Sequence, residues 1–125
     1  MVAGGRAQGK AMAIDYNQIQ ARVHLDRIQD NYRFLREHGG AIIPVIKADA
    51  YGHGLAPVAR ALKRAGADAL AVGTVEEAVR LRQMPFFGTI YVLLGVLDAA
   101  ECRAVHEHGL TPFVYHLDQL EWLAE

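Results

Sequence analysis

The chain has 125 residues and a formal net charge of -1, so it is long enough for one modest domain and has no bulk charge that would attract nucleic acid or an anionic membrane. Apolar residues make up 52% of it and charged residues 22%, which is typical of a soluble globular protein. Its single cysteine, Cys102, cannot form an internal disulfide, and the apolar runs are too short for a signal peptide or a membrane span. We therefore expect a cytoplasmic protein with no nucleic-acid or membrane partner.

From the amino terminus, the sequence first predicts a leader, a strand, a helix and a second strand. Residues 1–13 are rich in glycine, alanine and glutamine, and we expect a weakly ordered leader over residues 1–19. Residues 20–25 alternate polar and apolar side chains, as a strand with one solvated face does. Asp26 is a candidate N-cap for a helix that ends at Gly39–Gly40. The nearly all-apolar run 41–48 predicts a strand buried on both faces.

The alternation of helix and strand continues through the middle of the chain. A helix is expected over residues 55–65, with a proline tolerated in its first turn and a glycine after its end. Residues 69–73 form the next short apolar run and predict another buried strand. Thr74 and Glu77 have the spacing of a capping box, which opens a helix over 76–84.

The last third repeats the pattern once more. Residues 89–94 predict a strand, Asp98 opens a helix that Gly109 ends, and residues 110–116 predict a further strand. The final stretch, 117–125, begins an amphipathic helix with no glycine, asparagine or proline to stop it. Because natural domains rarely end inside a helix, we expect this chain to be truncated.

Short apolar strands joined through helices predict an α/β protein with parallel strands. About four βα units fit either a small open sheet or the first half of a (β/α)8 TIM-type barrel. No Gly-x-Gly-x-x-Gly pattern follows the first apolar strand, which argues against a dinucleotide-binding fold.

The segment with the strongest chemical signal is residues 45–54, VIKADAYGHG. Lys47 follows buried aliphatic residues at the end of a predicted strand, where a charged amine is costly unless it points into a site. Strand carboxyl ends carry the sites of barrels and open α/β sheets, and lysine is suited to Schiff-base chemistry. Tyr51 adds a hydroxyl, and Gly52 and Gly54 allow a tight turn near a ligand. The alternative is structural: such a lysine often reaches solvent, and the rest can be only a turn.

This segment resembles the pyridoxal-phosphate attachment motif of the alanine racemases, A-V-x-K-A-[ND]-A-Y-G-H-G, and departs from it mildly at Pro44 and Ile46. Three further segments resemble the family in the same order along the chain. They are the V-x-L-D opening at 23–32, the strand and helix at 70–82, and the strand at 91–95.

The resemblance implies a PLP-binding (β/α)8 barrel followed by a β-rich domain, in a homodimer that interconverts L-alanine and D-alanine for peptidoglycan precursors. Residues 20–125 then correspond to the amino-terminal half of the barrel domain. It implies that Lys47 holds pyridoxal 5'-phosphate as the internal aldimine and serves as one acid–base group. Tyr51 matches a tyrosine that contacts the cofactor phosphate, and Leu94 matches an aliphatic residue beside the pyridine ring. It assigns no chemical step to His53.

In the family, the opposing base is a tyrosine from the partner subunit, and an arginine against the pyridine nitrogen comes from a later strand. Neither lies within the 125 residues. Because a racemase needs a base on each face of the substrate, we expect this chain alone to be inactive.

The remaining polar clusters favour structural roles. His106 and His108 are two apart on a helix and do not face each other, so we expect no metal site. Glu76 is expected to pair with Arg80, and Arg80 and Arg82 to be solvated helix charges. Cys102 is expected to be half-buried and inert.

Other functions fit the same motif less well. A serine-specific or broad-specificity racemase, or a basic amino-acid decarboxylase, would share the fold, although the Tyr-Gly-His-Gly half favours racemases. The non-enzyme alternatives are a cofactor-carrying protein of the same barrel type and an inert truncated product.

Overall fold

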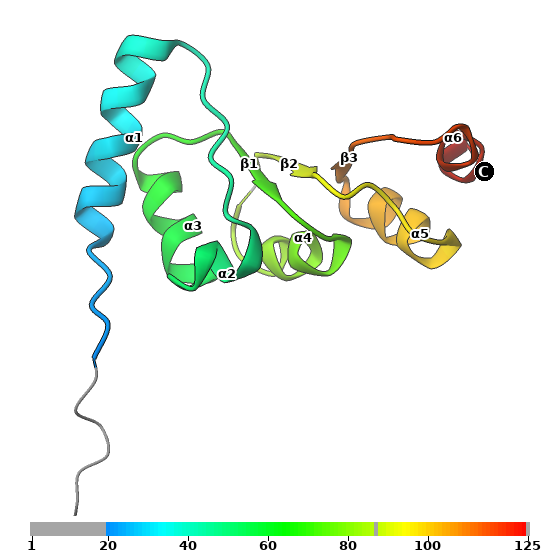
Figure 1. Cartoon of the computed structure of the whole chain (residues 1–125), viewed down its shortest axis with the longest axis horizontal. Helices are drawn as coiled ribbons and strands as arrows, with labels where there is room; N and C mark the ends of the chain where they lie inside the picture. Colours follow the sequence, from blue (N-terminus) through cyan, green and yellow to red (C-terminus); the bar gives the residue numbers. More distant parts are fainter. Residues whose placement is uncertain (1–19, 87, 125) are drawn as a thin grey trace, which may run out of the picture.

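The computed structural model describes residues 20–86 and 88–124, so the predicted leader lies outside the described residues. Helices and short strands alternate along most of this part (Figure 1). In chain order the elements are α1 Leu25–Gly39, α2 Lys47–Tyr51, α3 Leu55–Arg64, β1 Ala69–Val72, α4 Val75–Arg82, β2 Thr89–Val92, α5 Ala99–His108, β3 Thr111–Pro112 and α6 Leu117–Ala124.

The strands form one parallel sheet in the order β1-β2-β3. An isolated parallel bridge between Val45 and Ala71 adds the preceding segment to the β1 edge. Figure 1 shows α1 and α3 at one end of the molecule, α4 below β1 and β2, and α5 and α6 at the other end. This is the parallel βαβ arrangement that the sequence predicts.

The core lies between the sheet and its helices. Its largest fully buried side chains alternate along β1 and β2 and are joined by residues from α4 and the loop before α5: Leu70, Val72, Leu81, Ile90, Val92 and Val96. The opposite face of the sheet is more open. Tyr91 is only half-buried, and its ring lies 6.3 Å from that of Phe113, which is itself 44% exposed.

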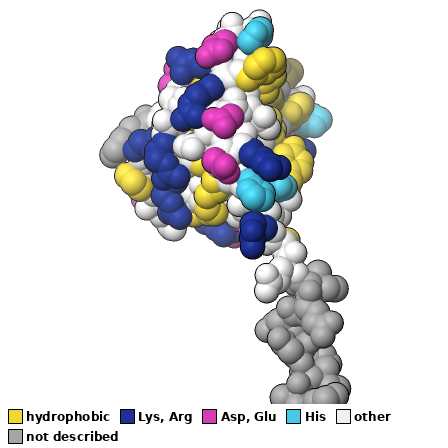
Figure 2. All heavy atoms as spheres, turned by 90° about the vertical axis from the view of Figure 1, so that its left-hand side faces the viewer, with side chains coloured by type: hydrophobic (Ala, Val, Ile, Leu, Met, Phe, Trp, Pro, Cys, Tyr) yellow, Lys and Arg dark blue, Asp and Glu magenta, His cyan; other side chains and the backbone are white. Residues whose placement is uncertain are grey.

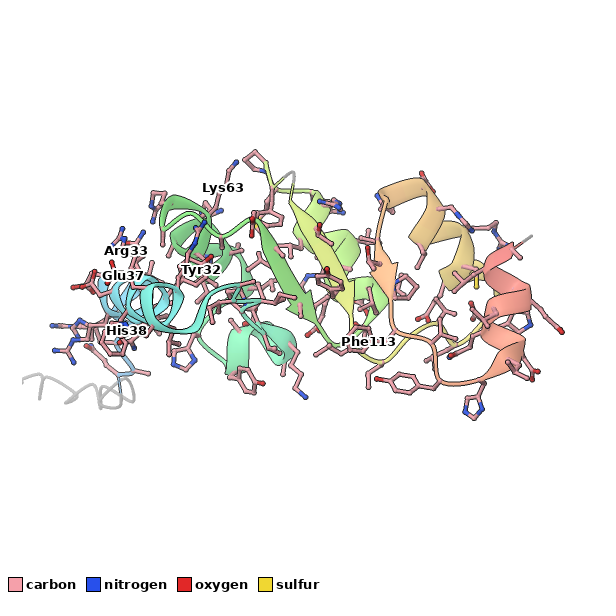
Figure 3. The ribbon with its side chains drawn as sticks, turned by 90° about the horizontal axis from the view of Figure 1, so that it is seen from above. Tyr32, Arg33, Glu37, His38, Lys63 and Phe113 are labelled. Carbon is pink, nitrogen blue, oxygen red and sulfur yellow. The ribbon has the colours of Figure 1, made fainter. Side chains whose placement is uncertain are left out.

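The outward end of the molecule is polar. Figure 2 faces α1 and shows cationic, acidic and histidine side chains with hydrophobic groups between them. In Figure 3, Tyr32 points from α1 toward the body of the protein, whereas Arg33, Glu37 and His38 point away from it. Tyr32 is accordingly buried in the core cluster.

The expected strand at 20–25 is wrong. Residues 20–24 have no regular structure, and α1 begins at Leu25. His24 is the N-cap, and Asp26 lies in the first turn, where a carboxylate favours the helix dipole. A strand needs hydrogen-bonding neighbours, and within 20–86 and 88–124 no strand pairs with this segment.

The strand expected at 41–48 is reduced to the single bridge at Val45. Two backbone hydrogen bonds hold it, from Ile46 N to Ala71 O at 2.8 Å and from Ala71 N to Pro44 O at 2.9 Å. It is also not buried on both faces, since Val45 is 41% exposed and Ile46 only 3%. Among the described residues, helices cover one face of the sheet, so alternate side chains of this segment lie on the open face.

The helix and cap predictions are confirmed from residue 55 onward. Helix α3 contains Pro57 in its first turn, and the Thr74–Glu77 capping box forms in full. Asp98 caps α5, and Gly109 ends it in a left-handed conformation. The strand expected at 110–116 shrinks to two residues, and the proline in it lies on the edge strand of the sheet, where a missing N–H is tolerated.

Candidate functional site

Lys47 stands at the carboxyl end of the first sheet segment, directly after the bridge to β1. Its neighbour Ile46 is hydrogen-bonded to Ala71, while the Lys47 side chain is exposed. Among residues 20–86 and 88–124, no hydrogen bond or ion pair joins the Lys47 ammonium group to another residue. The amine is therefore available to a ligand at the edge where parallel α/β folds place their sites.

The backbone after Lys47 takes an unusual left-handed turn. Ala48, Asp49, Ala50 and Tyr51 have φ angles of 51°, 54°, 55° and 55°. A left-handed residue with a Cβ costs roughly 1–2 kcal/mol, so four in a row need support from their surroundings. The sequence predicts a glycine turn here but not this conformation.

Side chains of the same motif supply part of that support. Asp49 Oδ1 accepts a hydrogen bond from Leu55 N at 2.7 Å, which caps the start of α3. His53 Nδ1 lies 2.9 Å from Ala50 O and 3.1 Å from Tyr51 O, so the tautomer with its proton on Nδ1 donates to these carbonyls. The side chains of the motif therefore stabilise its own turn. The role of His53 in this arrangement is structural.

Glu77 supplies the rest of the support from a separate element. Its Oε1 accepts from Ala48 N at 2.7 Å, and its Oε2 accepts from Gly73 N at 2.8 Å and from Thr74 N at 3.3 Å. Gly73 has little room for a side chain, since a Cβ there would lie 3.2 Å from Glu77 Oε2 and 3.5 Å from Lys47 Cβ. Sequence reasoning identified Glu77 only as a helix cap.

The other two predicted site residues are also exposed. Leu94 follows β2, and its N–H donates to Gly73 O at 2.9 Å, so Leu94 and Lys47 flank Gly73 at the same end of the sheet. Tyr51 ends the left-handed turn, and both Tyr51 and Leu94 are 60% exposed. Tyr115, which no prediction named, donates its hydroxyl to Leu93 O at 2.6 Å beside them. Contact of Lys47, Tyr51 and Leu94 with a cofactor stays a prediction.

Two predictions about surface charge are wrong. Arg82 is not a solvated charge, because its guanidinium donates to the four carbonyls of Phe86, Gly88, His108 and Gly109 at 2.8–3.0 Å. Burial lowers the pKa of Arg82 from its ordinary value.

The expected Glu76–Arg80 ion pair is not formed either; Arg33–Asp30 is the ion pair recorded within the described ranges. Cys102 is buried rather than half-buried. The described part of the chain holds no group of three or more potential metal ligands, and none of its helices is long and apolar enough to cross a membrane.

The fold and the site together define a class. The chain is part of a parallel α/β barrel-type domain, with an exposed lysine at the carboxyl edge of its first sheet segment and a left-handed turn directly after it. Comparisons with known proteins make this specific. A family model for the alanine racemase N-terminal domain matches residues 23–125.

Individual relatives agree with the family model. The chain is 50% identical over 113 residues to the alanine racemase of Nitratidesulfovibrio vulgaris (strain Miyazaki F), covering 90% of this chain and 30% of the relative. It matches the crystal structure of alanine racemase from E. faecalis with a TM-score of 0.73 and 29% identity, over 81% of this chain and 28% of that one.

A third structure is an alanine racemase from Bartonella henselae with covalently bound pyridoxal phosphate. It matches at 33% identity with a TM-score of 0.71, over 78% of this chain and 28% of that one. This chain therefore belongs to the alanine racemase family, in its N-terminal barrel domain, which confirms the resemblance and the fold class. The chain spans about 30% of the length of the curated relatives it matches.

Proposed function

We propose that residues 47–54, with Leu94, form one part of the pyridoxal 5'-phosphate site of an alanine racemase, and that Lys47 holds the cofactor covalently. The observation that carries the proposal is the exposed Lys47 amine at the carboxyl edge of a parallel sheet in a chain of this family. The covalently bound cofactor of the Bartonella henselae relative supports it.

The residues around Lys47 fit the chemistry of this cofactor. The Tyr51 hydroxyl is an exposed donor for a phosphate oxygen, and Leu94 is an exposed aliphatic side chain for the flat ring. When bound, pyridoxal phosphate supplies an electron sink that makes the α-hydrogen of an amino acid acidic enough to leave. In that setting, Lys47 moves a proton on one face of the substrate.

We further propose that the whole protein acts in the cytoplasm as a homodimer and supplies D-alanine for peptidoglycan precursors. The family assignment supports this, and the Tyr-Gly-His-Gly sequence favours alanine racemase over the decarboxylases of similar fold. The second base, the partner surface and the substrate-specificity residues would come from outside the 125 residues.

The cofactor proposal is tested by incubating the 125-residue chain with pyridoxal phosphate, reducing it with borohydride and mapping the modified peptide. We expect the adduct on Lys47 and its loss in Lys47→Ala. The matched control is Lys63→Ala. Lys63 lies on the opposite side of the molecule from α2 (Figure 3) and donates to Pro85 O, so its removal should leave the Lys47 adduct unchanged. An adduct distributed over other amines and unchanged by Lys47→Ala would refute the proposal.

A further inference from the structure

One carboxylate connects the reactive segment to the next βα unit. Glu77 is at the third position of α4, so its bonds to Gly73 N and Thr74 N are the local reach of a capping box. Its bond to Ala48 N is different in kind, because it spans 29 residues of sequence at a distance of 2.7 Å. Only the packing of α4 beside the segment after Lys47 brings these atoms together.

This long-range bond acts directly on the backbone of Lys47. Ala48 N belongs to the peptide group that follows Lys47. The residue before Lys47, Ile46, donates its N–H to Ala71 O at 2.8 Å. Both flanks of Lys47 are therefore fixed to the β1–α4 unit. The Lys47 side chain begins next to Gly73, because a Cβ added at Gly73 would lie 3.5 Å from the Cβ of Lys47.

The bond from Ala48 N to Glu77 also lies at the start of the left-handed turn. Ala48 is the first residue of the left-handed turn, with φ at 51°. A charged acceptor gives a stronger hydrogen bond than a neutral one, and it holds the peptide plane from which the lysine stem projects. Without it, the turn can relax toward ordinary angles and carry the amine away from the sheet edge.

We infer that Glu77 is a positioning residue, which holds the Lys47–Ala48 peptide so that the Lys47 amine stands at the cofactor position. The inference rests on the proposed function of Lys47. Glu77 does not touch the reacting atoms in this arrangement. Glu77 affects the reaction through the backbone of Lys47, the residue whose amine does touch the reacting atoms.

The test compares Glu77→Gln with Thr74→Ala in the 125-residue chain. Glutamine has one side-chain carbonyl oxygen, so it cannot accept from Ala48 N and from the N–H groups of Gly73 and Thr74 with separate oxygens, as Glu77 does. Thr74→Ala removes the reciprocal bond of the same capping box, Glu77 N to Thr74 Oγ1 at 3.2 Å, and leaves the bond to Ala48 intact. The two variants therefore weaken the same helix start, and only Glu77→Gln disturbs the lysine segment.

Three quantities are measured for each variant: the dissociation constant for pyridoxal phosphate at Lys47, the hydrogen-exchange rate of the Ala48 amide, and the urea unfolding curve. We expect Glu77→Gln to weaken cofactor binding by about tenfold and to accelerate Ala48 exchange by a similar factor. Thr74→Ala should leave both near the wild-type values, although it shifts the unfolding midpoint.

Equal cofactor affinity in Glu77→Gln and Thr74→Ala, or unchanged Ala48 exchange in Glu77→Gln, would overturn the inference and leave the proposed function standing. Failure of the wild-type chain to form the Lys47 adduct would instead overturn the proposed function, and the inference with it. If Glu77→Gln does not fold, the Glu77→Asp variant is used to test the positioning role of Glu77. It keeps the helix-start charge but is one methylene shorter, so weakened binding in the folded variant supports the inference and wild-type affinity contradicts it.

Discussion

At the residue scale, polar side chains in this protein act mainly on backbone groups of other segments. Glu77 accepts from Ala48 N, and Arg82 donates to the carbonyls of two residues before β2 and of two residues at the end of α5. Gln119, buried at 6% exposure, accepts from Tyr115 N at 2.7 Å and donates to Val96 O at 2.8 Å. Each of these side chains pairs with backbone N–H or C=O groups that lie outside its own helix.

Arg82 gives the clearest stability prediction at this scale. Arg82→Lys keeps the charge but replaces a planar fork of donors with a single ammonium group, so some of the four carbonyls lose their partner. We expect a loss of about 2–3 kcal/mol in the free energy of unfolding, measured by urea denaturation.

The control for that change is Arg80→Ala, an exposed residue on the same helix, which should stay within about 0.5 kcal/mol of wild type. A destabilisation by Arg82→Lys no larger than that of Arg80→Ala would show that the four bonds do not stabilise the fold.

At the element scale, the same helix-start device appears in successive βα units. The third residue of α4, α5 or α6 reaches back to the backbone of the loop before its own helix: Glu77 to Thr74 N, Glu101 to Leu97 N, and Gln119 to His116 N. Glu77 and Gln119 also reach the loop of the preceding unit, at Ala48 and Val96. The carboxyl edge of the sheet, where Lys47 stands, is thereby held as a connected row of loops.

The opposite edge depends on a close approach of β1 and β2 at Gly88. A Cβ at this position would lie 2.1 Å from Asp68 O, a backbone atom that already accepts from Thr89 N at 2.9 Å. Gly88→Ala must therefore push the strand starts apart, and we expect it to lower the free energy of unfolding by about 1–3 kcal/mol.

The predicted loss of stability is checked by comparing the thermal denaturation of Gly88→Ala with that of a control variant, Gly39→Ala. A Cβ at Gly39 meets only the end of the Ile42 side chain, at 3.3 Å, which can move. The prediction is wrong if both variants melt at the same temperature.

At the scale of the whole molecule, the chain has one covered sheet face and one open face. Ile43, Val45 and Phe113 are each more than 40% exposed, although their side chains are of the kind that fills a barrel interior. The candidate site is likewise one-sided, because Lys47, Tyr51 and Leu94 are all exposed at one edge of the sheet.

The 125-residue chain loaded with pyridoxal phosphate should therefore not racemise alanine, even where Lys47 forms its adduct. Racemisation needs proton transfer on both faces of the substrate, and Lys47 serves one. The measurement is conversion of D-alanine to L-alanine by the reconstituted chain, with a complete alanine racemase as the positive control. Turnover at the rate of that control would mean that a second base lies within these residues.

The sequence by itself determined the features that depend on neighbours within a few residues. The Thr74–Glu77 capping box, the Asp98 cap, the end of α5 at Gly109 and the alternation of helix and strand are local, so their residues alone specify them. The ten-residue motif around Lys47 also identified the family that the comparisons then showed.

Tertiary structure alone decided which segments pair and which polar groups meet. The expected strand at 20–25 has no paired neighbour among the described residues, and 41–48 keeps one bridge, because a strand exists only where another backbone completes its hydrogen bonds. Arg82 looked like a solvated charge and Glu77 like a simple cap, since two of the Arg82 partners lie 26 and 27 residues away and Ala48 lies 29 residues from Glu77. Sequence periodicity reports which face of a segment is apolar, but it carries no information on which distant carbonyl or N–H that face will meet.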